Sequence, residues 1–290
     1  MSGGRLKPAA FAHHQPGSVA DAARLLSDLA DRNVRIIAGG QSLAPMMAFR
    51  LATPDHLIDI NGVKELDFLE VGPSELRIGA LVRHKNFERI ADAGATGDLL
   101  GLVLPWIAHF PIRSRGTFCG SIAHADPASE WCLVSVALDA RMVLVGAEGV
   151  RAVAACDFFE GPMSTNAKPS ELLREVRLPL LPNGTRMGFQ EFSRRRGDFA
   201  LSMALATYRV EDGLIRDPRI AIGGAEDRPR RFASAEALLV GQAPSAVLFA
   251  AASQRVAEEL QPMEGPGTTA EYRRELTRTL TLRALEEAAR

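Results

Sequence analysis

The stretch VRIIAGGQSL (residues 34–43) sets the architecture of the first part of the chain, because it joins a short β-branched run to a turn with two adjacent glycines. β-Branched residues favour a buried strand, and glycine permits backbone conformations and close approaches that a side chain prevents. The turn AGGQSL (residues 38–43), called the first turn below, therefore presents backbone N–H groups directly after a strand. Such a nest binds anions.

A second glycine-containing turn, RGTFCGS (residues 115–121), lies far along the chain and is called the second turn below. Hydroxyl groups of Ser42, Thr117 and Ser121 add hydrogen-bond donors to the two turns. Together the turns can hold both phosphates of a dinucleotide with little cationic charge. Neither contains GxGxxG or GxxxxGK[ST], so the Rossmann and P-loop folds are disfavoured. The pattern alone leaves open that both are ordinary turns.

The composition is that of an ordinary globular protein with no preference for polyanions. The 290 residues are 47% apolar and 24% charged, and 34 Lys and Arg nearly balance 35 Asp and Glu. This balance argues against binding to DNA, RNA or an anionic membrane, and no apolar run is long enough to predict a membrane span. The N-terminal residues lack the apolar core of a signal peptide. The few scattered cysteines make a reducing cytoplasm the expected compartment.

Three scattered cysteines, Cys119, Cys132 and Cys156, limit the redox chemistry that the chain can perform alone. A [2Fe–2S] cluster usually needs four thiolates, and the cysteines have neither zinc spacing nor the number for a disulfide framework. We therefore expect no metal site, and any electron transfer needs an organic cofactor or a partner. We expect Cys132 to be a small core residue.

Apolar periodicity divides the chain into three expected units, residues 1–61, 62–180 and 184–290. The first contains a helix that begins at Ser18, which has Asp21 three residues later as in a capping box. The third contains antiparallel strands followed by segregated helices, which is typical of an α+β unit.

The second unit is expected to begin with a strand over residues 75–81, to continue through helices and to end in a hairpin. We predict helices over residues 84–93, 99–110 and 128–138, the last capped by Asp126. A hairpin is expected over residues 141–153, with Gly146 and Gly149 at its turn.

The two turns and the residues around them resemble the FAD-binding medium subunit of molybdenum hydroxylases, the family that includes aerobic carbon monoxide dehydrogenase and the flavin portion of xanthine dehydrogenase. The order and spacing of the matching segments agree from about residue 8 to residue 288. The segments are AGGQSL (38–43), RGTFCGSIAHADPASE (115–130), PSELL (169–173) with VRLP (176–179), and FSRRRGDFA (192–200).

The resemblance implies an α+β chain with a vanillyl-alcohol-oxidase-like (PCMH-type) FAD-binding fold. Two α/β subdomains (residues 1–61 and 62–180) would precede a C-terminal α+β domain (residues 184–290), with non-covalent FAD extended between them. One departure concerns Cys119, which replaces the first glycine of the family's usual Thr-x-Gly-Gly. Three interpretations of Cys119 are then open. Its backbone has a positive φ and is strained, or the position tolerates a small side chain, or the thiol is redox-active.

The resemblance also implies which residues bind FAD. The two turns would cradle the pyrophosphate, Glu130 would accept from ribose hydroxyls, and Leu173 and Phe199 would lie near the isoalloxazine, with Asp198 bracing that turn. Gln190 takes a position where some relatives have Lys, and His124 is either a flavin contact or a hydrogen-bonded loop histidine. No catalytic side chain is implied. The full set is Ile37, Ala38, Gly39, Gly40, Gln41, Ser42, Leu43, Thr117, Gly120, Ser121, His124, Glu130, Leu173, Gln190, Asp198 and Phe199.

The expected function is that of an electron-transfer flavoprotein subunit. The resemblance implies a large molybdopterin-binding subunit and a small [2Fe–2S] subunit as partners, assembled as a dimer of heterotrimers, with electrons passing through FAD to an external acceptor. The alternative is a self-sufficient FAD-dependent oxidase or dehydrogenase of a small organic substrate, which usually needs a base over the flavin.

Overall fold

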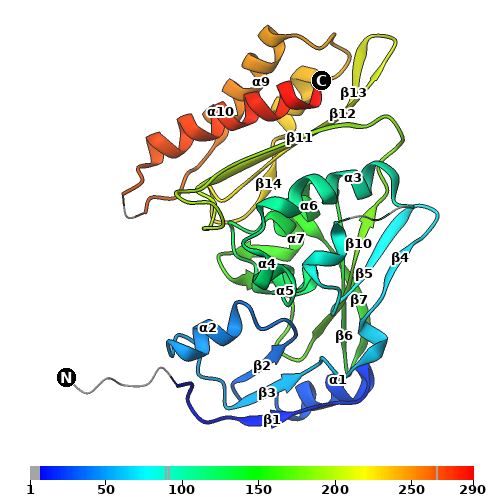
Figure 1. Cartoon of the computed structure of the whole chain (residues 1–290), viewed down its shortest axis with the longest axis vertical. Coiled ribbons are helices and arrows are strands. Elements are labelled where there is room, and N and C mark those ends of the chain that lie inside the picture. Colours follow the sequence, from blue (N-terminus) through cyan, green and yellow to red (C-terminus); the bar gives the residue numbers. More distant parts are fainter. Residues whose placement is uncertain (1–6, 89, 91, 266) are drawn as a thin grey trace.

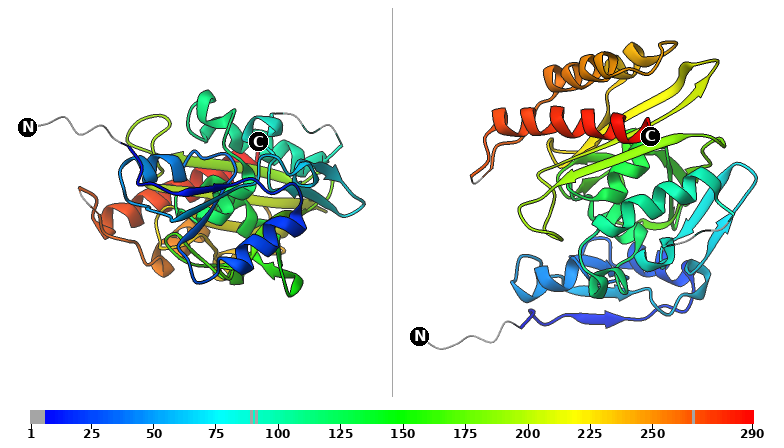
Figure 2. Two further views of the ribbon diagram at one scale, coloured as in Figure 1. Left: turned by 90° about the horizontal axis from the view of Figure 1, so that it is seen from below. Right: turned by 45° about the horizontal axis from the view of Figure 1, so that its top comes forward.

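The computed structural model describes residues 7–88, 90, 92–265 and 267–290 and stacks three sheets along the long axis of the molecule (Figure 1). The first sheet lies at the end nearest the N-terminus, the second in the middle and the third at the opposite end. Two long C-terminal helices cover the outer face of the third sheet, as the turned views also show (Figure 2).

The first sheet is parallel and has the order β1-β3-β2. Its N-terminal helix is capped as predicted, because the Ser18 hydroxyl accepts a hydrogen bond from the Asp21 N–H at 3.1 Å. The first turn connects β2 to α2. The elements of this unit are β1 (Ala12–His14), α1 (Val19–Asp28), β2 (Val34–Ile37), α2 (Leu43–Ala48) and β3 (His56–Asp59).

The second sheet is antiparallel, with the order β4-β5-β10-β6-β7. Its central strand β10 comes last in sequence, after all the helices of the unit, and the predicted hairpin is confirmed as β6 and β7. The strands are β4 (Leu69–Val71), β5 (Glu75–Gly79), β6 (Arg141–Gly146), β7 (Gly149–Ala154) and β10 (Leu172–Pro179), beside a small pair β8 (Phe159–Gly161) and β9 (Ser164–Thr165).

The helices of the second unit differ from the sequence expectation in their bounds. Those before β6 are the 3₁₀ helices η1 (Lys64–Leu66), η2 (His84–Phe87) and η3 (Leu104–Trp106) and the α-helices α3 (Gly94–Val103), α4 (Phe110–Arg113), α5 (Phe118–His124) and α6 (Glu130–Ala137); α7 (Ala155–Phe158) follows β7. The expected helix over residues 84–93 is only η2, and residues 89 and 91 lie outside the described residues.

Two prolines explain the errors in the expected helix over residues 99–110. Helix α3 begins earlier and ends at Val103, because Pro105 has no N–H to continue the α-helical ladder. Pro111 does not end a helix but lies in the first turn of α4, where its missing N–H costs nothing. The expected helix over residues 128–138 is α6, which starts at Glu130 after the N-cap Ser129.

Asp126 was expected to cap that helix and instead stabilises the turn before it, since its Oδ1 accepts from the Ala128 N–H at 2.9 Å. The second turn was expected as a glycine loop, but it contains the first turn of α5. Thr117 is the N-cap of this helix, and its side chain accepts from the Gly120 N–H. Local hydrogen bonding therefore decides both boundaries.

The third sheet is antiparallel, with the order β11-β12-β13-β14, and its predicted strands and helices are confirmed. A tight turn at Asp212 and Gly213, both with positive φ, joins β12 to β13. The elements are β11 (Arg186–Phe192), β12 (Ser202–Glu211), β13 (Leu214–Gly223), β14 (Arg230–Arg231), α8 (Ala233–Leu239), α9 (Ala246–Glu259) and α10 (Ala270–Ala288).

Helix α6 lies between the second and third sheets, and its seven residues Trp131 to Ala137 are all buried. One apolar core joins the first two sheets to α6, and a second core fills the space between the third sheet and α8–α10. No helix among the described residues combines the length and the apolarity needed to cross a bilayer.

Candidate functional site

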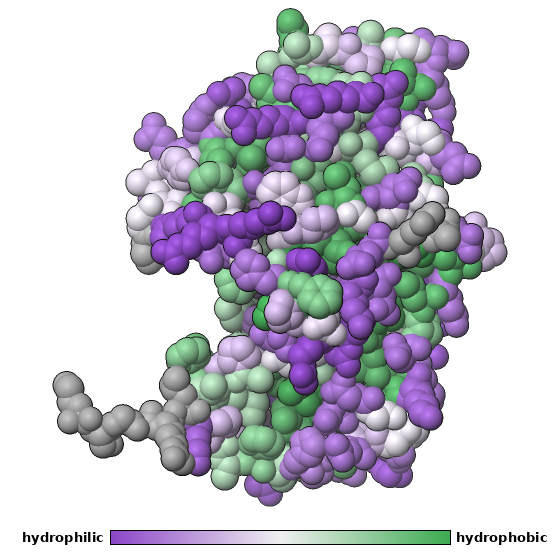
Figure 3. All heavy atoms as spheres, in the orientation of Figure 1, coloured by the Kyte–Doolittle hydropathy of each residue, from purple (hydrophilic) through white to green (hydrophobic). Residues whose placement is uncertain are grey.

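A cavity of about 490 Å³ lies between the first turn, the second turn and α2. This volume is within the usual range of ligand pockets. The space-filling view shows the molecule hollowed on its left side, above the lower lobe that carries α2 (Figure 3). The cavity reaches from Asn33 and Thr53 in the first unit to Met163, Leu172 and Leu173 in the second.

The two turns touch each other through glycine. A Cβ placed on Gly39 would lie 2.5 Å from the carbonyl oxygen of Arg115 and 2.7 Å from the α-carbon of Gly116. Both distances are shorter than any real Cβ contact allows, so a side chain at residue 39 would push the turns apart. Gly39 is therefore the point where the first unit closes onto the second.

Two side chains brace this contact from behind. The Asn61 amide donates from Nδ2 to the Ala38 carbonyl at 2.8 Å, and its Oδ1 accepts from the Arg83 guanidinium at 2.6 Å. Arg83 also donates to the carbonyl of Arg115. The chain from Ala38 through Asn61 and Arg83 to Arg115 thus joins the backbones of the two turns, away from the main cavity.

The first turn keeps its own donors free. Across the described part of the chain, no group accepts a hydrogen bond from the backbone N–H of residues 39–42, while Gln41 fixes the turn by donating from Nε2 to the Gly39 carbonyl at 2.9 Å. Gly40 has a φ of +71°, a conformation that glycine adopts without strain. Free N–H groups with no Cβ in front of them form a cradle that fits a diphosphate.

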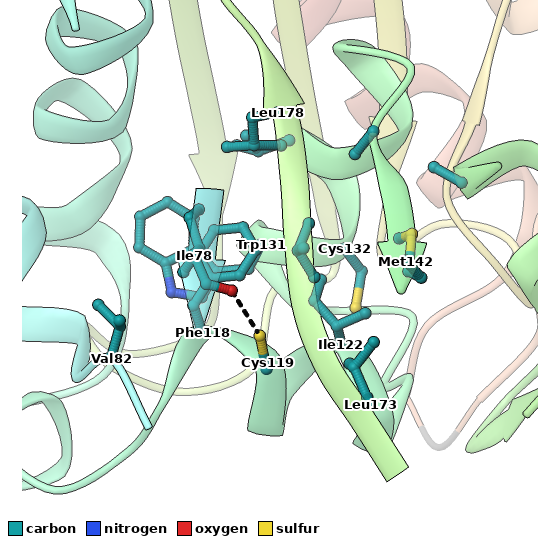
Figure 4. Packing of buried hydrophobic residues seen from close by; sticks show 14 of the residues in the cluster. Ile78, Val82, Phe118, Cys119, Ile122, Trp131, Cys132, Met142, Leu173 and Leu178 are labelled. Carbon is teal, nitrogen blue, oxygen red and sulfur yellow. Dashed lines mark hydrogen bonds between the residues drawn. The ribbon is translucent and has the colours of Figure 1, made fainter. Parts of the chain in front are cut away.

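The second turn is held firmly by the core. The Phe118 N–H donates to the Val82 carbonyl at 3.1 Å, and the Phe118 ring stacks on Trp131 with centroids 5.0 Å apart. Cys119 points into the same core, where its thiol donates to the Ile78 carbonyl at 3.4 Å (Figure 4). Burial raises the pKa of the Cys119 thiol above its ordinary value.

Cys119 therefore packs as a small buried side chain. Its backbone is helical and not in the positive-φ region, so a residue with a Cβ is accommodated at the position where the resemblance implies glycine. A buried thiol with a raised pKa has little thiolate, which disfavours the redox reading.

The cavity carries little charge. Among the described residues that line it, Arg35 is the one Lys, Arg, Asp or Glu side chain. His84 is 4% exposed, and burial, with contributions from Arg113 and Arg83, lowers its pKa to about 4, so its imidazole is neutral. Backbone dipoles and neutral donors, rather than a cationic cluster, make up the wall.

Most of the residues that the sequence singles out line this cavity. They come from the end of β2, the first turn, α5 with its N-cap, and the start of β10. They are Ile37, Ala38, Gly39, Gly40, Gln41, Ser42, Leu43, Thr117, Gly120, Ser121, His124 and Leu173.

Four of the expected residues lie elsewhere. Glu130 starts α6, where burial raises the pKa of its carboxyl to about 7. Gln190 on β11 donates from Nε2 to Glu287 of α10 at 3.0 Å. Asp198 and Phe199 lie in the exposed connection between β11 and β12, and Phe199 is 72% exposed. The structure does not bring these four to the cavity wall.

Sequence reasoning missed several residues that line the cavity, including Arg35, Met46, His84 and Met163. His84 had a detectable signal, because it closely follows the apolar run Ala80-Leu81-Val82 and a buried histidine is an unusual core residue. Its closeness to the second turn arises from the backbone pairing of His84 N–H with the Gly116 carbonyl at 3.0 Å, which no local pattern shows.

Family profiles cover almost the whole chain. The profile described as "FAD binding domain in molybdopterin dehydrogenase" matches residues 9–181, and that of "CO dehydrogenase flavoprotein C-terminal domain" matches residues 187–288.

Relatives of similar length agree with these profiles. The nicotine 6-hydroxylase medium subunit of Paenarthrobacter nicotinovorans is 38% identical over 98% of this chain and 99% of its own. The carbon monoxide dehydrogenase medium chain of Hydrogenophaga pseudoflava is 32% identical over 97% and 98%.

Solved structures show the same fold. A chain of the carbon monoxide dehydrogenase from Hydrogenophaga pseudoflava superposes with a TM-score of 0.93 at 33% identity, covering 97% of this chain and 98% of that one. A chain of quinoline 2-oxidoreductase from Pseudomonas putida 86 gives 0.92 at 35% identity, with 98% of each chain covered.

Proposed function

Because the chain belongs to the family of FAD-binding medium subunits of molybdopterin dehydrogenases, we propose that it is the electron-transfer subunit of a multi-subunit molybdenum hydroxylase. In this proposal a large molybdopterin-binding subunit oxidises the substrate, and electrons reach this chain from the [2Fe–2S] clusters of a small subunit. They then leave to an external acceptor. The proposed assembly is a cytoplasmic dimer of such heterotrimers.

The observation that carries the proposal is the closure of the two turns on each other at Gly39 and Gly116. The first turn faces the cavity with free N–H groups, and the second turn, from a unit separate in sequence, lines the same cavity with Thr117 and Ser121. The lining carries almost no charge. A dinucleotide diphosphate is the ligand that such a paired cradle suits, since it offers acceptor oxygens to both segments at once.

The residues of this chain then have distinct binding tasks. The N–H groups of the first turn and the hydroxyls of Thr117 and Ser121 would hold the diphosphate. Glu130 would accept from ribose hydroxyls, and Leu173 with the segment around Phe199 would lie near the isoalloxazine. When bound, FAD supplies a carrier that takes up electrons from one partner and gives them to another. The proposal assigns no catalytic side chain to this subunit.

The isolated chain tests the proposal. We expect the purified protein to bind FAD with one molecule per chain, to be bleached by dithionite, and to stay oxidised with purines, aldehydes or N-heterocycles. Adding the molybdopterin-binding and [2Fe–2S] subunits should make substrate-driven bleaching possible. Bleaching of the isolated chain by such a substrate would instead support the self-sufficient oxidase, and a stably folded chain that binds no FAD would refute both.

A further inference from the structure

His84 lies at the wall of the cavity, and one of its ring nitrogens is hydrogen-bonded to a core residue. It is the first residue of η2 and is 4% exposed, and the fully buried Trp131 of α6 donates from Nε1 to its Nδ1 at 2.8 Å. An indole N–H can only donate. Nδ1 must therefore carry a free lone pair, and the proton of the neutral ring sits on Nε2.

The neutral state of this ring follows from its surroundings. Burial is the main cause that lowers the pKa of His84 to about 4, and the cationic side chains of Arg113 and Arg83 lower it further. Near neutral pH the ring thus has a single form, with an acceptor at Nδ1 and a donor at Nε2.

The donor edge of the ring lies against the second turn. A Cβ on Gly116 would be 2.5 Å from Nε2, and the His84 backbone N–H donates to the Gly116 carbonyl. His84, Gly116, Thr117 and Cys119 line the same cavity. None of the described residues accepts a hydrogen bond from Nε2, so this donor is available to a ligand.

We propose that His84 is a ligand-binding residue that donates its Nε2–H to a diphosphate oxygen of the dinucleotide, and that Trp131 is a positioning residue that fixes the required tautomer. The inference rests on the proposed FAD site and adds a neutral side-chain donor to its backbone cradle. It also gives Gly116 a reason to lack a side chain, because a Cβ there would displace the ring. Gly116 and His84 thus act as one unit.

Two substitutions at His84 separate the two ring nitrogens. His84→Asn keeps an acceptor for Trp131 near the position of Nδ1 and removes the donor, whereas His84→Gln can place an amide N–H near the position of Nε2. We expect His84→Asn to weaken the binding of both FAD and ADP by about tenfold, as for one hydrogen bond to a charged group. Riboflavin, which has no phosphate, should bind as before. His84→Gln should recover part of the loss.

The control variant is His14→Asn, in the first sheet, where His14 pairs with His56 and lies outside the cavity wall. It should leave all three affinities unchanged. Trp131→Phe keeps an aromatic ring but removes the indole donor, so it should weaken FAD and ADP by a smaller factor than His84→Asn.

A measurement on the unaltered protein gives an independent test. ¹⁵N NMR of the imidazole should show a protonated Nε2 and an unprotonated Nδ1, and the Nε2–H signal should shift when ADP is added. Equal FAD and ADP affinities of His84→Asn and the unaltered protein, no shift with ADP, or a loss confined to riboflavin and FAD would each overturn the inference. If the unaltered chain itself binds no FAD, the proposed function fails instead.

Discussion

The two turns that face the cavity differ in burial and in how their backbone N–H groups are hydrogen-bonded. The first turn is partly exposed and keeps its backbone N–H groups free, while Gly116, Thr117, Phe118 and Cys119 of the second turn are buried and bonded into the core. The second turn is thus a rigid surface, and the first is a segment that closes onto it at Gly39. The comparison leads us to expect that FAD affinity depends on how closely the first turn approaches the second.

A substitution that separates the two turns should have the largest effect on FAD binding. Gly39→Val introduces a β-branched side chain where the carbonyl of Arg115 and the α-carbon of Gly116 already lie. Because this side chain would push the turns apart, we expect the purified protein to retain no FAD. The flavin content, measured by absorbance after denaturation, checks this. Gly17→Val is the control, because nothing lies within 4 Å of its Cβ position. Normal flavin content in Gly39→Val would show that FAD binding does not require the close contact between the two turns.

Lowering the pH should reduce the free energy of unfolding, because His84 beside the second turn is buried in its neutral form. Its pKa is 6.5 in the unfolded chain and about 4 in the folded one, so between these values only the unfolded chain binds the proton. Stability from this residue is fully present above pH 6.5 and is lost as pH falls toward 4, by about 3 kcal/mol. Urea unfolding at several pH values should show this slope in the unaltered protein relative to His84→Asn. Parallel pH profiles for the two proteins would contradict it.

A substitution at Glu130 tests whether the FAD site extends beyond the second turn to the start of α6. Glu130→Ala should weaken FAD binding by about 1–3 kcal/mol, the loss expected for one charge-assisted hydrogen bond. Titration is best done at pH 8, since the pKa of this carboxyl is about 7 and it is then mostly ionised. Glu65→Ala, at an exposed residue of η1, should bind FAD normally. A loss well below 1 kcal/mol would place the ribose contact elsewhere.

Helix caps give the smallest expected effect and the closest match between variant and control. Thr117 and Thr269 each cap a helix by accepting from a backbone N–H at 3.1 Å. Replacing either by Val should lower the free energy of unfolding by about 1 kcal/mol. Only Thr117→Val should also weaken FAD, because α10 lies away from the cavity. Equal FAD affinities in the two variants would show that neither the Thr117 hydroxyl nor the cap that it forms contributes to FAD binding.

The sequence predicted elements well where a local signal decides them. The Ser18 cap and the hairpin around Gly146 both depend on residues that are close in sequence. The third sheet was predictable for the same reason, since its three long strands are neighbours in the chain.

The prediction failed in two situations: where a local cap or proline was outweighed by the apolar or glycine pattern, and where contacts far along the chain decide. Thr117 caps a helix that glycine spacing had suggested as a loop, and Pro105 ended α3 before the apolar pattern did. His84 went unnoticed because its partners, Trp131 and Gly116, are 47 and 32 residues away. Glu130, Asp198 and Phe199 do not line the cavity, so their proposed contacts with FAD depend on the resemblance alone.

Hydrogen–deuterium exchange with and without FAD tests the central claim, that both turns hold one diphosphate, most directly. The account predicts that FAD slows exchange in peptides covering residues 38–43 and 115–121 together, with the larger change in the first turn, and that ADP alone is enough to produce it. Protection confined to one of these segments, or found only in other peptides, would contradict it.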